Sequence, residues 1–440
     1  MTASTSQVAD CVAAYAARLQ AVTGTRHQVA SPLGAWLLLA LAAPASSGAD
    51  RETLTRVLGC DPGTAAAAAA GLLADPHPVV ASAVAAWTAA GAQLGPDFDR
   101  WRSELPPGVA SGDLPGQAGL DAWAREHTFG LIDRFPVQAD SLLLVLASAL
   151  ATKVSWTVPF QLAPAASLGD ASPWARQLSR VLRTPAPAAG GHTQYIAGTP
   201  DAGDVIVHVA IAGGGLQVVS VAAGPQVPDS SVLAAAHRLA IAQATGGRIP
   251  RRELSDLPLG NTPLWRLREV SAQADTCSAV LPAWSASSDH DLTDPALGFA
   301  AASSALLPGR GPWDARQAAM ARYSRTGFEA AAVTAVAVAM AARVPARRRE
   351  AELRFGHPYA VVAVTTEPGA GGAGGTGAGQ RSLWHGLPVF CAWVSQPEDA
   401  TDARASDDRA SDARASDARA SGDSASGDSA SGETAPGERT

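Results

Sequence analysis

The sequence has almost no lysine, few cysteines and no long uninterrupted hydrophobic run. Lys153 is the only lysine among 33 lysines and arginines, and the four cysteines show no Cys-x-x-Cys spacing. We therefore expect four small buried thiols and neither a disulfide framework nor a zinc site. The purest apolar stretch, residues 330–342, has 13 residues, whereas a transmembrane helix needs roughly 18 or more. We expect no membrane span.

The formal net charge of −7 is concentrated at one end of the chain. Residues 398–440 carry eleven acidic residues and five arginines, so they hold −6 of that charge and leave the rest of the chain nearly neutral. A neutral body gives no electrostatic argument for a nucleic-acid or anionic-membrane partner. The segment repeats Ala-Arg-Ala-Ser-Asp with a period of five and offers no apolar face to bury, so it predicts a disordered acidic tail.

The first twenty residues do not have the pattern of a signal peptide. A basic region followed by an unbroken apolar segment is missing, and Val8, Val12, Tyr15, Ala16 and Leu19 recur at helical spacing. We expect an amphipathic helix here, and on the sequence alone a cytoplasmic location.

Helical patterns gather early in the chain and strand patterns gather late. Ser31-Pro32 begins a buried helix over 30–46, and a second helix is predicted over 229–245. The apolar run 141–156 is typical of a central strand buried on both faces. Two strand-like runs flank a Gly-rich connector at 368–379, which predicts a hairpin with an expanded loop. This partial interleaving favours an α+β fold with helices packed on mostly antiparallel sheets.

The usual catalytic and cofactor motifs are missing from the sequence. It contains no G-x-S-x-G, no H-E-x-x-H, no phosphate loop and no dinucleotide fingerprint. The nearest polar cluster, Asp289-His290-Asp291 with Asp294, is more typical of a solvated turn than of a metal site. We expect no catalytic residue, no cofactor and no metal. The remaining enzyme alternative is a hydrolase whose Ser, His and Asp meet only in space.

The segment GFEAAAVTAVAVAMAARVPARRR, residues 327–349, is ambiguous between helix and strand. Ala330, Ala331 and Ala332 favour a helix, whereas from Thr334 onward larger and smaller side chains alternate up to Met340. Taken alone, the pattern fits a fixed core strand or a short Ala-rich helix.

Seven sequence landmarks follow one another along the chain. They are ASPLGAWLLLALAAPAS (30–46), WAREHTFGLIDRF (123–135), LVLASALATKVSWTVPF (144–160), VLPAW (280–284), GFEAAAVTA (327–335), FGHPYAVVAV (355–364) and GLPVFCAWVSQP (386–397). Their order is that of the landmarks in serpins, the serine protease inhibitor fold family, and the chain resembles a divergent, bacterial-type member of that family.

The resemblance implies one domain over residues 1–397, followed by the tail at 398–440. Its fold would have three β-sheets, a large central sheet A plus sheets B and C, and about eight or nine helices. It also implies an exposed reactive-centre loop at about 325–349. A target protease cuts such a loop, and the cut loop inserts as a new strand of the central sheet and distorts the attached protease before the acyl bond is hydrolysed.

The partner implied is a serine endopeptidase, with the inhibitor expected to be a monomer and, by the resemblance, able to meet its target outside the cell. Met340, Ala341, Ala342 and Arg343 are the candidates for the cleaved bond. Cleavage at the first three suits an elastase-like or subtilisin-like target, which we favour, and cleavage after Arg343 suits a trypsin-like one. The expected hinge residues are Gly327, Phe328, Glu329, Ala330, Ala331, Ala332 and Thr334.

Some positions depart from the family pattern and favour an alternative, a non-inhibitory serpin fold acting as protease substrate, decoy or binding protein. Phe328 stands where a small threonine is usual, and overpacking costs about 1–3 kcal/mol. A slow insertion would let the protease escape, so Phe328→Thr should raise the ratio of trapped to cleaved product. Ser148 and Gln317 replace a common Asn and His, and they are expected to bond each other or nearby backbone. The expected sheet-opening residues are Ser31, Ser148, Lys153, Trp156 and Gln317.

Overall fold

The chain folds into an α+β unit over Met1–Ala400. We obtained it as a computed structural model, which describes residues 5–137, 142–186, 190–307, 309, 314–328, 346–367 and 382–401. The described helices are α1 (Thr5–Thr23), α2 (Pro32–Ala42), α3 (Gly48–Leu58), α4 (Pro62–Ala74), α5 (Pro96–Ser103), α6 (Gln117–His127), α7 (Asp229–Thr245) and α8 (Phe299–Leu306).

The helix boundaries follow local signals in the sequence. Ser31 caps α2 by accepting a hydrogen bond from the Gly34 N–H, and Pro32 occupies the first turn. All eleven residues of α2 are buried, which explains why the sequence shows no polar face there. Helix α7 ends where Gly246 adopts a left-handed conformation (φ 73°). The predicted apolar face of α1 is buried, as expected.

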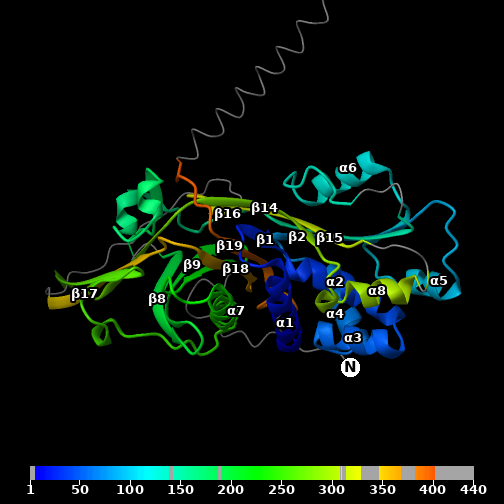
Figure 1. Cartoon of the computed structure of the whole chain (residues 1–440), viewed down its shortest axis with the longest axis horizontal. Helices are drawn as coiled ribbons and strands as arrows, with labels where there is room; N and C mark the ends of the chain where they lie inside the picture. Colours follow the sequence, from blue (N-terminus) through cyan, green and yellow to red (C-terminus); the bar gives the residue numbers. More distant parts are fainter. Residues whose placement is uncertain are drawn as a thin grey trace, which may run out of the picture. The chain divides into compact units, whose positions relative to one another are not determined.

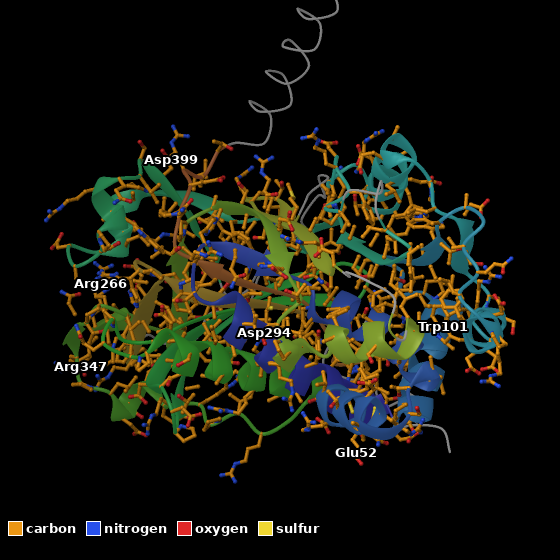
Figure 2. All side chains as sticks on the ribbon, turned by 45° about the vertical axis from the view of Figure 1, so that its right-hand side comes forward. Glu52, Trp101, Arg266, Asp294, Arg347 and Asp399 are labelled. Atoms are coloured by element: carbon orange, nitrogen blue, oxygen red, sulfur yellow. The ribbon has the colours of Figure 1, made fainter. Side chains whose placement is uncertain are left out.

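Two six-stranded sheets make up much of the unit. One has the order β1 (Gln28–Ala30), β19 (Pro388–Val394), β18 (Tyr359–Thr365), β10 (Leu216–Ala222), β9 (Gly203–Ala212) and β8 (His192–Thr199). The other has the order β11 (Gly260–Asn261), β12 (Trp265–Ala272), β17 (Ala346–Arg354), β13 (Thr276–Leu281), β7 (Arg180–Arg183) and β6 (Gln161–Pro164). Arg266 and Arg347, on the neighbouring strands β12 and β17, lie at the same side of the molecule (Figure 2).

The remaining two sheets are smaller, and residues 144–155 run from one into the other. The first has the order β3 (Val109–Asp113), β2 (Val80–Thr88) and β4 (Leu144–Thr152). The second has the order β14 (Trp284–Asp291), β15 (Arg316–Tyr323), β16 (Gly327–Phe328) and β5 (Val154–Ser155). Only Lys153 separates β4 from β5, so the two together form one central sheet that is parted between β4 and β15.

Helices cover both faces of this central sheet. Figure 1 shows α6 on one side of β2 and β15, and α2, α3, α4 and α8 on the other. Under α6, Trp87 of β2 and Val145 and Ala147 of β4 form a small apolar cluster with Leu120 of the helix. The expected strand over 141–156 is therefore covered on both faces, but it is two strands and not one, because it breaks at Lys153.

The predicted C-terminal hairpin and the four cysteines can be compared with the structure. The hairpin around 368–379 is formed by β18 and β19, which pair antiparallel, and its connector lies outside the described residues. All four cysteines carry free thiols, but only Cys11 and Cys391 are buried, whereas Cys60 and Cys277 are partly exposed.

His290 belongs to the core and not to a solvated turn, since its Nε2 lies 2.7 Å from the Val29 carbonyl oxygen. Among the described residues, no group of three or more potential metal ligands is close enough to hold an ion. No single described helix has the length and apolarity to cross a membrane, although α3 and α4, bent by 53°, reach that threshold as a pair.

Candidate functional site

The candidate site is the opening in the central sheet between β4 and β15. Strand β4 pairs with β2 along its whole length and β15 pairs with β14, but within the described chain no ladder joins β4 to β15. A cavity of about 60 Å³ lies between them, lined by residues of both strands and by α2 and α6. As far as the described residues go, each strand thus presents an unpaired edge to the opening, which is the geometry that accepts an additional strand.

One end of the opening is already filled by the two residues of β16. Phe328 pairs antiparallel with Tyr323 of β15 on one side and with Val154 of β5 on the other, and Gly327 pairs with Ser155. A tight turn returns the chain from β15, because the Ser324 N–H and hydroxyl both donate to the Gly327 carbonyl, at 3.0 Å each. At this end the opening is therefore closed, because β16 pairs with both β15 and β5.

Backbone and indole hydrogen bonds fix the chain just before β16. The Trp156 indole N–H donates to the Ser324 carbonyl at 2.9 Å, and the Trp156 amide donates to the Thr326 carbonyl at 2.9 Å. The Phe160 amide donates to the Arg325 carbonyl at 3.0 Å. Residues 156–160 thus form a strap that holds residues 324–326 in place.

A pair of stacked histidines supports this strap. His192 Nε2 lies 2.7 Å from the Val158 carbonyl, which can only accept, so this nitrogen carries the proton. His192 Nδ1 then accepts from His208 Nε2 at 3.1 Å. Burial lowers the pKa of His192 to about 4. Burial, and then the neighbouring His192, lower the pKa of His208 well below its usual 6.5, so both rings are neutral at pH 7.

The Phe328 side chain is buried among aromatic rings. It is 3% exposed, and its ring centroid lies 6.4 Å from that of Trp156, 6.3 Å from Trp284 and 6.5 Å from Phe390. The structure therefore differs from the expectation that a ring at this position lacks room. The room exists because Trp284, Phe390 and Tyr323 come from three other strands, a neighbourhood that the local sequence does not reveal.

The sheet-opening residues fall into two groups. Gln317 of β15 is buried beside the start of α2, where its Oε1 accepts from the Ser31 amide and its Nε2 donates to the Ser31 carbonyl, both at 2.8 Å. The Ser31 hydroxyl also donates to the Val389 carbonyl at 2.8 Å. Gln317 thus bonds nearby backbone and not Ser148, which lies across the opening on β4.

Lys153 and Trp156 lie at the other end of the opening. Lys153 is exposed at the break between β4 and β5, and Trp156 is fully buried against Tyr323. Sequence reasoning did not assign Trp284, Tyr323 or Phe390 to the site, although Trp284 ends the VLPAW segment and Phe390 lies in the segment 386–397. The remaining expected site residues lie outside the described residues: Glu329, Ala330, Ala331, Ala332, Thr334, Met340, Ala341, Ala342 and Arg343.

Comparisons with known proteins point to one fold. No protein-family model matches the chain, and no curated protein matches it. Among solved structures, native tengpin, a thermophilic serpin, superposes with a TM-score of 0.59 at 12% identity, covering 89% of this chain and 94% of tengpin. Cleaved Serpin 42Da gives a TM-score of 0.58 at 17% identity, covering 91% of this chain and 100% of that one.

A binding protein is equally similar to the chain. Thyroxine-binding globulin in complex with thyroxine gives a TM-score of 0.58 at 12% identity and covers 88% of this chain and 99% of that one. The fold is that of the serpins. The expected α+β class is thereby confirmed.

Proposed function

We propose that the protein is a serpin-type inhibitor that traps a serine endopeptidase by loop cleavage and insertion. The observation that carries the proposal is the seated β16 at the head of the opening between β4 and β15. Phe328 lies inside the sheet, between two strands that no ladder among the described residues joins further along. A cut loop could extend β16 by pairing with both edges, and that added pairing would release the strain that drives trapping.

The residues after the hinge suggest which protease the loop attracts. Small or apolar side chains at 340–342 support an elastase-like or subtilisin-like target, and Arg343 supports a trypsin-like one. In this proposal the protein contributes no catalytic residue of its own. The protease supplies the nucleophile, and the inhibitor supplies the bond to be cut and the sheet.

An SDS gel after incubation with elastase, subtilisin or trypsin tests the proposal. We expect an adduct that survives denaturation, together with a released C-terminal peptide whose mass identifies the cut bond. The same protease with its serine blocked beforehand should give neither product. Arg343→Ala should abolish adduct formation with trypsin but leave an elastase adduct intact if the bond lies within residues 340–342.

The alternative is a serpin fold that is cut as a substrate or decoy, or that binds another molecule. The similarity to thyroxine-binding globulin supports the binding-protein form of this alternative. Clean cleavage between residues 340 and 347 without any adduct would support it and reject trapping. Thermal melting before and after cleavage adds a second criterion, because a cut inhibitor that has inserted its loop should melt at a much higher temperature than the intact chain.

A further inference from the structure

The Phe328 ring connects the central sheet to the sheet behind it. Trp156 follows β5 and Trp284 begins β14, both in the central sheet, whereas Phe390 belongs to β19 of a six-stranded sheet. Tyr323, the register partner of Phe328, stacks on Trp284 with ring centroids 6.0 Å apart. The ring is thus enclosed by aromatic surfaces on several sides, an arrangement that favours one position of the side chain.

Strand β16 is too short to be held by ladder hydrogen bonds alone. It has two residues, and Gly327 has no side chain to bury, so Phe328 supplies nearly all the apolar surface that the strand removes from water. The strap at residues 156–160 fixes the chain before the strand, since its hydrogen bonds go to residues 324–326. Burial of this one ring is therefore what distinguishes a seated β16 from a frayed end.

We propose that Phe328 is a positioning residue that seats the first rung of the inserting strand before cleavage and thereby sets its register. This role rests on the proposed trapping function. Side chains alternate along a strand, so a strand continued from Phe328 would turn residues 330, 332 and 334 to the same side as the ring. Those residues are Ala330, Ala332 and Thr334, which are small enough for the narrow opening between β4 and β15.

The proposal reverses the effect on trapping that the sequence predicts for Phe328→Thr. If the ring obstructed insertion, a smaller residue would help trapping, whereas a seated ring makes the same substitution harmful. Without the ring the strand must be nucleated after cleavage, in competition with hydrolysis of the acyl bond. A tenfold slower insertion, equivalent to about 1.4 kcal/mol in its barrier, would shift the outcome tenfold toward cleaved product.

The test measures how many inhibitor molecules are consumed per trapped protease, using the full chain and whichever protease forms the wild-type adduct. We expect that number to rise modestly in Phe328→Leu and by roughly tenfold in Phe328→Ala. Phe328→Thr should follow Phe328→Ala. The matched control is Phe355→Leu, which removes the same atoms from a fully buried ring that contacts Tyr359 and not β16. An unchanged or lower number in the Phe328 variants overturns the proposal.

A measurement without protease separates this inference from the proposed function. Amide hydrogen exchange in peptides covering 153–160 and 324–328 should be faster in Phe328→Ala than in wild type and unchanged in Phe355→Leu. If wild type forms no adduct, trapping is rejected, and the exchange result still decides whether Phe328 seats β16. Equal exchange in Phe328→Ala and wild type rejects the seating role even if trapping occurs.

Discussion

The Gln317 side chain joins β15 to the start of α2, and its removal should destabilise the protein measurably. Gln317→Leu removes two hydrogen bonds, from the Ser31 amide and to the Ser31 carbonyl, in a site where Gln317 is 8% and Ser31 5% exposed. Each bond contributes about 1 kcal/mol net, and a buried group left without a partner costs about 1–3 kcal/mol. Leucine restores some apolar contact, so we expect a net loss of about 2–4 kcal/mol.

This loss converts to a modest change in melting temperature. An unfolding entropy of about 2.1 cal/mol/K per residue gives about 0.8 kcal/mol/K for a unit the size of Met1–Ala400. The melting temperature should therefore fall by about 2–5 °C, and the urea midpoint should fall with it. The control is Gln217→Leu, at a partly exposed residue of β10 whose Oε1 has no hydrogen-bond partner in the described part of the chain.

The comparison with the control variant tests the role assigned to Gln317. Gln217→Leu should change the free energy of unfolding by less than about 1 kcal/mol. A Gln317→Leu variant that lost no more than this control would refute the argument, because it would mean that the Ser31 backbone finds other partners at little cost.

Two further predictions concern charge. Unfolded histidine has a pKa near 6.5, and that of folded His192 is about 4, so the unfolded state binds more protons between these values and stability falls as the pH drops through that window. From pH 6.5 to pH 5 the loss from His192 should be about 2 kcal/mol, and urea unfolding of His192→Gln should show a smaller acid loss than wild type; equal losses would contradict this. Glu352 is buried among Arg183, Arg266 and Arg354, so Glu352→Ala should cost about 3–5 kcal/mol in the same assay. Its control Glu350→Ala, which breaks a more exposed pair, should cost less than about 1 kcal/mol, and similar losses in both would contradict the reasoning.

Local sequence signals were sufficient for several elements. Helix α7 has the predicted bounds because Pro228 and Gly246 flank it, and each restricts or frees its own backbone whatever packs against the helix. The partial interleaving of early helical and late strand patterns predicted the α+β class, and the order of the serpin-like segments predicted the serpin fold.

The pairing of distant strands could not be predicted in the same way. The run 141–156 has the same apolar pattern whether its edge is paired or open, and β15 lies more than 160 residues further along the chain. The break at Lys153, the opening beside β4 and the partner of Gln317 all depend on how these remote strands meet. Side-chain periodicity records which face of a strand is buried and carries no information on which strand lies beside it.

Phe328 illustrates the difference between what the sequence determines and what the tertiary structure decides. The sequence by itself determined that an unusual aromatic residue stands at the expected hinge, separated by Glu329 from three small alanines. Only the tertiary structure decided whether that ring has room, because Trp156, Trp284 and Phe390 reach it from strands far away in the chain. Residue type and spacing are local properties of the chain, whereas the volume around a side chain belongs to the packed core that all its strands build together.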